Sequence, residues 1–333
     1  MDPITQGVLA ATFAQTRAQK KDLAKAALIG GVAGMAPDLD VLIRSSSDPL
    51  LALDFHRHFT HSLFFIPFGA LLCAALMYWL VARRWTLGFA QIYLWCFLGY
   101  ATHGLLDACT TYGTQLLWPL SRERFAWDLV SVIDPLFTLP LLVCVMWSAF
   151  GRRQQAVWAG ILWCVVFFSA AGIQHQRALA MAETLAQARG HETLRLDVKP
   201  SFANLAVWKV VYETDTHFYV DAVKPGMFSP RVWEGERILK YEQRRDVPWL
   251  MAGSQQALDV ARFDWFSDGF IAQNPKNTQQ LIDIRYSMIP NEIAPLWGIA
   301  LSPSAPARAH VAYWTNRSRG RESASRLLDM MFE

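Results

Sequence analysis

The chain has 333 residues, of which 53% are hydrophobic and 18% are charged, and its formal net charge is +3. This composition is more apolar than that of an ordinary soluble protein, and so small a net charge argues against a nucleic-acid-binding protein. Nearly all the long apolar runs fall within residues 1–175, whereas residues 176–333 have the composition of a soluble domain. All five cysteines lie in or beside these runs, so no disulfide framework is expected. The sequence therefore predicts two domains with these bounds.

Three apolar runs are long enough to cross a bilayer as helices, because about 20 residues span its hydrocarbon core. They are residues 62–81, 86–106 and 156–173. A fourth run, 132–150, is nearly as long, although Pro135 and Pro140 predict a kink or a late start. Residues 23–36 are rich in small side chains and predict a shorter, closely packed helix. We expect a membrane all-α helical bundle of about four to six helices, followed by a soluble α+β domain.

Basic residues mark alternate ends of the successive predicted helices. They are Arg17, Lys20, Lys21, Arg83, Arg84, Arg152 and Arg153. The positive-inside rule places these ends in the cytoplasm, so the opposite ends and residues 176–333 are expected outside it. The sequence thus predicts a multi-pass protein of the inner (plasma) membrane with a periplasmic or extracytoplasmic C-terminal domain.

Aspartate and histidine side chains gather at the outward ends of the predicted helices, where burial without a partner is costly. His103 and Asp107 are four residues apart on a predicted helix, which places both on one face and within reach of one metal ion. Asp38 and Asp40 follow Pro37, and an extended D-x-D segment would point both carboxylates roughly the same way. Each pair has a plainer alternative, a satisfied polar contact for the first and a helix-end turn for the second.

The stretch "HRHFTHS" carries three histidines at the start of an apolar run. His56 and His61 are about 140° apart around an ideal helix, so they cannot share one helix face. Thr60 as a helix N-cap would place His61 in the first turn and His56 in the incoming loop, from which both can converge on one point. Arg57 is then a candidate for binding an anion such as phosphate, and His58 is expected to be a bystander or to support a ligand.

The candidates for metal ligation are Asp38, Asp40, His56, His61, His103 and Asp107. Histidine and aspartate without thiolate suit Zn, Mn or Fe in a water-activating site, whereas a structural zinc site favours cysteine. Six candidates exceed the needs of one tetrahedral ion, which favours a two-metal site. The sequence therefore predicts one or two divalent ions, with zinc as the first choice.

Five segments occur in order among the hydrophobic helices: "MDPITQG", "PDLD", "HRHFTHS", "HGLLDACTTYGTQLLWPLS" and "IDPLF". In this combination, residues 1–175 resemble the YdjM-like family of membrane-bound metal-dependent hydrolases, some described as LexA-regulated inner-membrane proteins. The resemblance implies hydrolase chemistry and a ligand set at the six positions named above. The H-x-x-x-D helix also looks like that of zinc-dependent phospholipases C and related nucleases, which by analogy implies a phosphoester substrate.

Two further positions bear on the site. Many family members have histidine where this chain has Gln6, so either the site is one ligand short or Gln6 supports it by hydrogen bonding. Asp134, within "IDPLF", is a catalytic candidate or alternatively the cap of the helix that follows. The aromatic and basic segment 110–129 predicts contact with lipid headgroups, either as an anchor or as a substrate contact.

The distal part alternates apolar and polar residues in short runs, which is typical of β-strands. Strands are predicted at 193–200, 205–214, 217–223, 280–289, 296–301 and 310–316, and helices near 254–266 and 321–331. The histidines of this part stand singly and are expected to be structural; they are His175, His191, His217 and His310.

The leading hypothesis is a membrane-bound metal-dependent hydrolase that acts on an ester or phosphoester, lipids included, at the outer membrane–water interface. The alternative is a non-enzymatic membrane protein, in which a metal or polar cluster holds the helix ends together and the soluble domain binds a partner. A transporter is disfavoured because the acids cluster at one face and do not follow a path across the midplane. Membrane lipids are the expected partners, and no nucleic acid is expected.

Overall fold

The protein is described by a computed structural model that covers residues 1–226, 229–316 and 320–333. It divides into two units. Unit 1 consists of Met1–Leu42, Phe55–Ile173 and Phe202–Asn204, and unit 2 consists of Ile43–Asp54, Gln174–Ser201 and Leu205–Glu333. The loop Ile43–Asp54 therefore belongs to unit 2, although the chain before it and after it belongs to unit 1.

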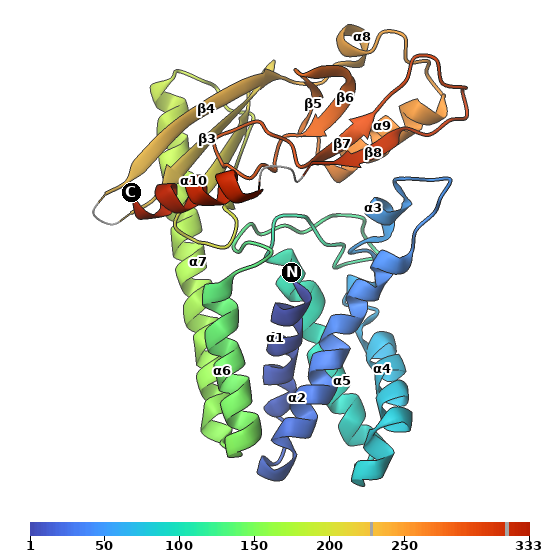
Figure 1. Ribbon diagram of the computed structural model, residues 1–333, viewed down its shortest axis with the longest axis vertical. Helices are drawn as coiled ribbons and strands as arrows, with labels where there is room; N and C mark the ends of the chain where they lie inside the picture. The colour runs from blue at the N-terminus through green and yellow to red at the C-terminus, as the bar shows by residue number, and fades with distance from the viewer. Residues whose placement is uncertain (227–228, 317–319) are drawn as a thin grey trace. The chain divides into compact units, whose positions relative to one another are not determined.

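Unit 1 is helical (Figure 1). Its longer helices are α1 (Pro3–Gln15), α2 (Leu23–Met35), α4 (Ile66–Leu80), α5 (Phe89–Ala108), α6 (Pro135–Gly151) and the start of α7 (Gln154–Ala188). Short turns of helix connect them: η1 (Lys20–Asp22), η2 (Ala36–Leu42), α3 (Leu51–Phe55, mostly in unit 2), η3 (Phe59–His61) and η4 (Ala82–Trp85). Helix α1 packs against α2 and α5, and α5 also packs against α4.

Small residues bring α1, α2 and α5 unusually close together. A Cβ atom added to Gly34 of α2 would lie 2.1 Å from the Cβ of Ala10, and one added to Gly99 of α5 would lie 2.2 Å from the carbonyl oxygen of Gly30. The backbones approach so closely only because these positions lack side chains. The closely packed small-residue helix that the sequence predicts at 23–36 is therefore confirmed as α2.

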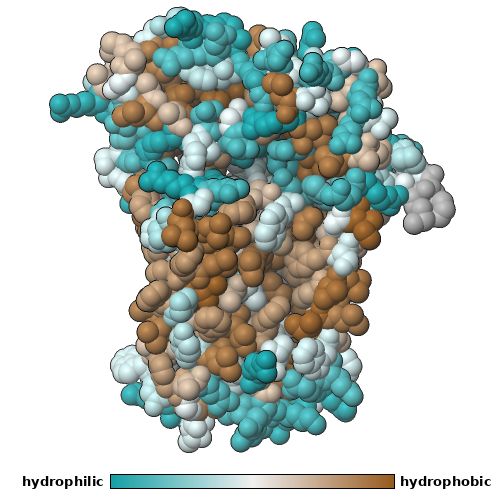
Figure 2. Space-filling view, turned by 180° about the vertical axis from the view of Figure 1, so that it is seen from behind, coloured by the Kyte–Doolittle hydropathy of each residue, from teal (hydrophilic) through white to brown (hydrophobic). Residues whose placement is uncertain are grey.

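Within the described residues, one helix, α7, is long and apolar enough to cross a membrane by itself. The segments Leu51–His61 and Ile66–Leu80 pass the same test only as one span bent by 87°, and α6 is a shorter apolar helix. Outward apolar side chains are nevertheless common in unit 1, as the brown surface over its helices shows (Figure 2). Leu72 of α4 is 67% exposed, and Val143 of α6 is 64% exposed. The sequence prediction of several spans stays a prediction.

Unit 2 contains two antiparallel sheets, each with its strands in chain order. The first sheet has β1 (Arg195–Pro200), β2 (Trp208–Glu213), β3 (His217–Lys224) and β4 (Arg231–Leu239), and the second has β5 (Ile271–Asn274), β6 (Asn277–Asp283), β7 (Trp297–Ala300) and β8 (Ala312–Thr315). Its helices are α8 (Gln243–Asp246), α9 (Gln255–Phe266) and α10 (Gly320–Phe332). The structure thus confirms the predicted order of a helical N-terminal region followed by a domain that contains β-sheets.

The two sheets of unit 2 each bury one face against a helix. Ala178, Ala182 and Ala186 recur every four residues along α7 and pack against Trp208 and Tyr212 of the first sheet. This spacing places the three alanines on one helix face, where small side chains allow a close approach. The second sheet buries Leu281 and Ile299 in a cluster with Phe263 of α9 and with Leu50 from the loop Ile43–Asp54.

Candidate metal centre

Four side chains from three separate elements of unit 1 converge on one point. Asp38 lies in η2, His61 lies in η3, and His103 and Asp107 lie one turn apart on α5. One ligand atom of each can be chosen so that all four atoms lie within 4.8 Å of one another. The cluster can therefore hold a metal ion, as the sequence predicts for histidine and aspartate side chains in this region.

The distances between the four atoms fit one tetrahedral ion. His61 Nε2 and His103 Nε2 are 2.9 Å apart. Asp38 Oδ1 lies 3.5 Å from the first nitrogen and 3.3 Å from the second, and Asp107 Oδ2 lies 3.4 Å and 3.9 Å from them. Two tetrahedral ligands at about 2.0–2.1 Å from an ion are about 3.3 Å apart. The cluster is thus already near the size that such an ion requires.

Both histidines have their other ring nitrogen engaged. His103 Nδ1 lies 2.5 Å from the carbonyl oxygen of Gly34, and because a carbonyl only accepts, Nδ1 carries the proton. His61 Nδ1 lies 3.0 Å from Thr60 Oγ1 and 3.3 Å from Asp40 Oδ2. These partners leave the Nε2 lone pairs of both rings facing the cluster, which is the arrangement found around metal-bound histidine.

Close backbone packing brings His61 to α5. A Cβ atom added to Gly104 would lie 2.2 Å from the carbonyl oxygen of His61. Only glycine therefore fits at position 104, where α5 contacts the η3 turn. One further observation bears on a metal: Asp107 Oδ2 is buried and accepts no hydrogen bond from any described residue, although Arg57 Nε lies 3.0 Å away as an ion pair. A buried carboxylate oxygen with spare acceptor capacity fits a cation.

The other two predicted ligands lie outside this cluster. Asp40 Oδ2 accepts hydrogen bonds from the backbone N–H of Arg57 and from Thr60 Oγ1, both at 3.0 Å. His56 Nδ1 lies 2.9 Å from Asp40 Oδ1, the ring of His56 lies 6.0 Å from that of His61, and the His56 side chain is 40% exposed. Burial raises the pKa of Asp40, but hydrogen bonds from His56 and His61 outweigh it and hold the pKa below its usual range. Asp40 is therefore placed to orient His61.

The local structure of both sequence segments differs from the prediction. Residues 36–42 form a 3-10 helix and not an extended D-x-D, so Asp38 and Asp40 reach opposite ring nitrogens of His61. Thr60 is not a helix N-cap, because His61 ends the short η3 turn and α4 begins only at Ile66. The hydroxyl of Thr60 instead links Asp40 to His61, a role that the sequence did not reveal.

The two predicted catalytic residues have different surroundings. Arg57 is buried beside the cluster, where its Nη1 donates to Thr110 Oγ1 at 2.7 Å and its guanidinium lies 5.2 Å from the ring of Tyr112. Asp134 caps α6, since its Oδ1 accepts from the backbone N–H groups of residues 136 and 137. Asp134 is not among the four clustered side chains. His58 packs against the ring of Trp118, with the ring centroids 5.2 Å apart.

Gln6 also reaches the cluster. Its Nε2 donates to Asp107 Oδ1 at 2.9 Å, and its Oε1 is buried without a hydrogen bond to any described residue. The amino group of Met1 contacts the same Asp107 oxygen. Gln6 thus supports Asp107 in the structure. Thr110 was not predicted to be a site residue. The only signal for it in the sequence is its position three residues after Asp107, about one helical turn away.

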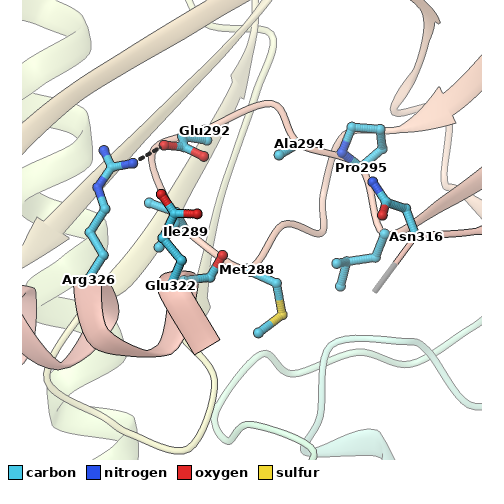
Figure 3. A pocket seen from close by; sticks show the side chains of 10 residues that line it. Met288, Ile289, Glu292, Ala294, Pro295, Asn316, Glu322 and Arg326 are labelled. Atoms are coloured by element: carbon cyan, nitrogen blue, oxygen red, sulfur yellow. Dashed lines mark hydrogen bonds and ion pairs between the residues drawn. The ribbon is translucent and has the colours of Figure 1, made fainter. Parts of the chain in front are cut away.

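Solvent reaches the cluster at Asp38. The Asp38 side chain is 20% exposed, whereas the side chains of His61, His103 and Asp107 are fully buried. A pocket in unit 2 shares no residue with the cluster; Glu292 and Arg326 form an ion pair at its edge, and Glu322 and Met288 also line it (Figure 3). The chemistry of metal ligation therefore lies in unit 1 and not at this pocket.

The apolar helices and the histidine–aspartate cluster define a helical protein with a candidate metal centre. Residues 1–178 match the family model of the YdjM inner membrane protein, so the chain belongs to that family. The resemblance drawn from the sequence is confirmed, and membership supports a location in the inner membrane.

Two relatives give the range of similarity. The "Uncharacterized protein YfhP" of Bacillus subtilis (strain 168) is 30% identical over 131 residues, which are 39% of this chain and 39% of that protein. The "Inner membrane protein YbcI" of Escherichia coli (strain K12) is 36% identical over 108 residues, 31% of this chain and 60% of that protein. The matches thus cover less than two thirds of each relative, and neither name states a reaction. No solved structure matches the chain.

Proposed function

We propose that the protein is a membrane-bound metal-dependent hydrolase that acts on an ester or phosphoester, with phospholipids among the candidate substrates, at the membrane–water interface. The observation that carries this proposal is the cluster of Asp38, His61, His103 and Asp107, whose four ligand atoms have the spacing of a single divalent ion. Nitrogen and oxygen ligands without thiolate favour zinc, with manganese or iron as alternatives.

The chain's own residues have separate roles in this proposal. A bound divalent cation supplies Lewis acidity, which activates water at neutral pH. Asp38 and Asp107 supply the negative charge that holds the cation, and Asp40 orients the ring of His61. The guanidinium of Arg57, held by Thr110 and paired with Asp107, places a fixed positive charge beside the site, where an oxyanion or phosphate oxygen of the substrate would be stabilised.

The proposal includes a membrane arrangement with several spans. Helix α7 supplies one span by length and composition. The exposed apolar side chains of α4 and α6, such as Trp79 and Phe150, support their contact with lipid as well. The positive-inside rule, applied to Arg83, Arg84, Arg152 and Arg153, favours an extracytoplasmic location for unit 2.

A second function is favoured by one specific observation. Four protein ligands complete a tetrahedral shell, which is typical of structural zinc sites, whereas catalytic zinc sites usually keep one position for water. In this alternative the metal only ties η2, η3 and α5 together, and unit 2 binds a partner. The 20% exposure of Asp38 favours the hydrolase, because it leaves one side of the cluster accessible to water and substrate.

The test uses the full-length chain purified in detergent. Its metal content is measured before and after treatment with a chelator, and hydrolysis of phospholipids, a generic phosphodiester and simple esters is followed with zinc or manganese added back. The hydrolase proposal predicts turnover that is lost on chelation and restored by one of the metals. Bound metal with no turnover on any of these substrates would favour the structural alternative. No bound metal would contradict both the hydrolase and a structural metal, and would leave a polar cluster as what holds the helix ends together.

A further inference from the structure

The loop Ile43–Asp54 joins two of the three segments that carry the metal-ligand candidates, yet it belongs to unit 2. Asp38 and Asp40 lie just before it in the chain, and His56 and His61 lie just after it. The chain therefore leaves unit 1 after η2, which carries Asp38, and returns to it directly before His56, ahead of η3, which carries His61.

One arginine of α9 holds the loop at two points. Arg262 Nη1 and Nη2 donate to Asp48 Oδ1 and Oδ2 at 3.1 and 3.0 Å, which is a bidentate pair. Its Nε and Nη2 donate to Asp54 Oδ2 at 3.0 and 2.5 Å, and Nη1 also reaches Asp259 Oδ1 at 3.0 Å. The guanidinium of Arg262 is only 25% exposed. Bidentate, partly buried pairs of this kind fix geometry more strongly than exposed single contacts.

An apolar anchor lies between the two aspartates. Leu50 is 1% exposed and belongs to the core cluster that contains Val260 and Phe263 of α9. Leu53 packs against the same cluster. The loop is thus attached to α9 by a buried side chain and by the two carboxylates that Arg262 binds, so it is part of the packing of unit 2.

The residues directly after Asp54 make the contacts that shape the metal centre. His56 Nδ1 lies 2.9 Å from Asp40, and Arg57 pairs through Nε with Asp107 at 3.0 Å. Arg57 has φ +62°, a left-handed conformation that costs a non-glycine residue about 1 kcal/mol and persists only when its surroundings enforce it. Asp54, whose carboxylate Arg262 binds, lies three residues before Arg57 in the chain.

We propose that Arg262 is a positioning residue for the metal centre: by binding Asp54 and Asp48 it fixes the His56–Arg57 turn, and through that turn unit 2 sets how tightly the cluster retains its metal. This inference rests on the proposed metal centre.

The experiment compares Arg262→Ala, Arg262→Lys and the control Arg195→Ala in the full chain. Arg195 is a matched control because it forms a part-buried ion pair with Glu213 at 2.6 Å in the same unit but does not touch the loop. Zinc affinity is measured in detergent by competition with a chromophoric chelator. Arg262→Ala should weaken zinc binding by up to about tenfold, the lower end of the loss expected when a group that contacts a metal ligand is removed, because Arg262 acts through the turn and contacts no ligand itself. Arg262→Lys should lie between Arg262→Ala and the wild type, and Arg195→Ala should match the wild type.

A second measurement separates positioning from general destabilisation and from failure of the proposed function. Hydrogen exchange should accelerate within residues 54–61 in Arg262→Ala, and the sheets of unit 2 should keep wild-type exchange. A double-mutant cycle with Asp54→Ala should be non-additive for zinc affinity. Wild-type affinity and exchange in Arg262→Ala, or faster exchange throughout unit 2, would overturn the inference. If the wild type binds no zinc, the metal proposal fails, while exchange within 54–61 still decides whether Arg262 holds the turn.

Discussion

His61 Nε2 and His103 Nε2 face each other at 2.9 Å, and both rings are buried. Nδ1 of His103 donates to Gly34 and Nδ1 of His61 faces Asp40, so both rings turn Nε2 toward the point where the carboxylates of Asp38 and Asp107 also lie. Two lone pairs directed at each other repel unless a proton or a cation lies between them. The pair is therefore the strongest single indication of where an ion would bind.

The first prediction is the stoichiometry. The geometry favours one ion, whereas the surplus of ligand candidates in the sequence favoured two. We expect about one zinc per chain, loss of zinc in His103→Gln, and retention of zinc in His56→Gln, because His56 lies beyond Asp40 and outside the cluster. Elemental analysis of the purified variants checks this. Two ions per chain, with loss of one in His56→Gln, would restore the two-metal model.

The second prediction separates a ligand from the residue that orients it. Asp38→Asn removes a charged ligand from the cluster, so metal binding should be lost. Asp40→Asn keeps all four clustered atoms but weakens the partner of His61 Nδ1, so zinc affinity should fall by about 10–100-fold without being abolished. Zinc titration of both variants is the measurement. Equal loss in the two variants would place Asp40 among the ligands themselves.

The third prediction concerns the close approach of η3 and α5. In Gly104→Ala the new methyl group would lie 2.2 Å from the carbonyl oxygen of His61, so the turn must move and both metal content and melting temperature should fall. Gly172→Ala in α7 is the matched control, because no atom lies within 4 Å of its new methyl group. The control should keep its metal and gain about 0.5–1 kcal/mol of stability. Full zinc occupancy in Gly104→Ala would refute the tight packing.

Most of the elements of unit 2 could be predicted from alternation in the sequence, and the exceptions have physical reasons. Strand β4 was missed because both its faces are largely exposed, so "RVWEGERIL" shows no apolar–polar alternation. Strand β5 was missed because "IAQN" places two apolar residues before two polar ones and so also shows no alternation. Both strands are defined by hydrogen bonding to a neighbour, which a single sequence does not display.

The candidate site was predictable from the sequence only where its residues lie close together along one helix. His103 and Asp107 share a helix face, and this spacing can be read directly from the sequence. The choice between Asp38 and Asp40 as ligand depends on the 3-10 helix of η2, which directs them to opposite nitrogens of His61. The clamp formed by Arg262 joins residues more than 200 positions apart, and no local pattern indicates it.

The fourth prediction concerns orientation in the membrane. The basic residues at 83–84 and 152–153 flank the predicted spans, and the positive-inside rule then places unit 2 outside the cytoplasm. A reporter enzyme that is active only in the cytoplasm, fused after Glu333, should stay silent, and one that is active only in the periplasm should work. The opposite result would reverse the proposed orientation of unit 2.

The last prediction concerns Lys209, a buried lysine of β2 in unit 2. Its Nζ donates to Ser287 Oγ at 2.9 Å and to the carbonyl oxygens of Pro290 and Glu292 at 3.2 Å. Burial lowers the pKa of Lys209 to about 7, well below the value of about 10.4 expected in the unfolded chain. Between these pH values the unfolded chain binds more protons than the folded one, so the contribution of Lys209 to the free energy of unfolding rises with pH.

The measurement is the melting temperature of the wild type, Lys209→Met and the control Lys276→Met over the range from about pH 7 to 10. Lys209→Met also removes hydrogen bonds, so only the trend with pH is predicted: the wild type should gain stability relative to Lys209→Met as the pH rises. Lys276 is exposed on the turn between β5 and β6, so its variant should stay at a constant offset from the wild type. A pH-independent difference between wild type and Lys209→Met would mean that Lys209 stays charged in the folded chain, with its three acceptors compensating for burial.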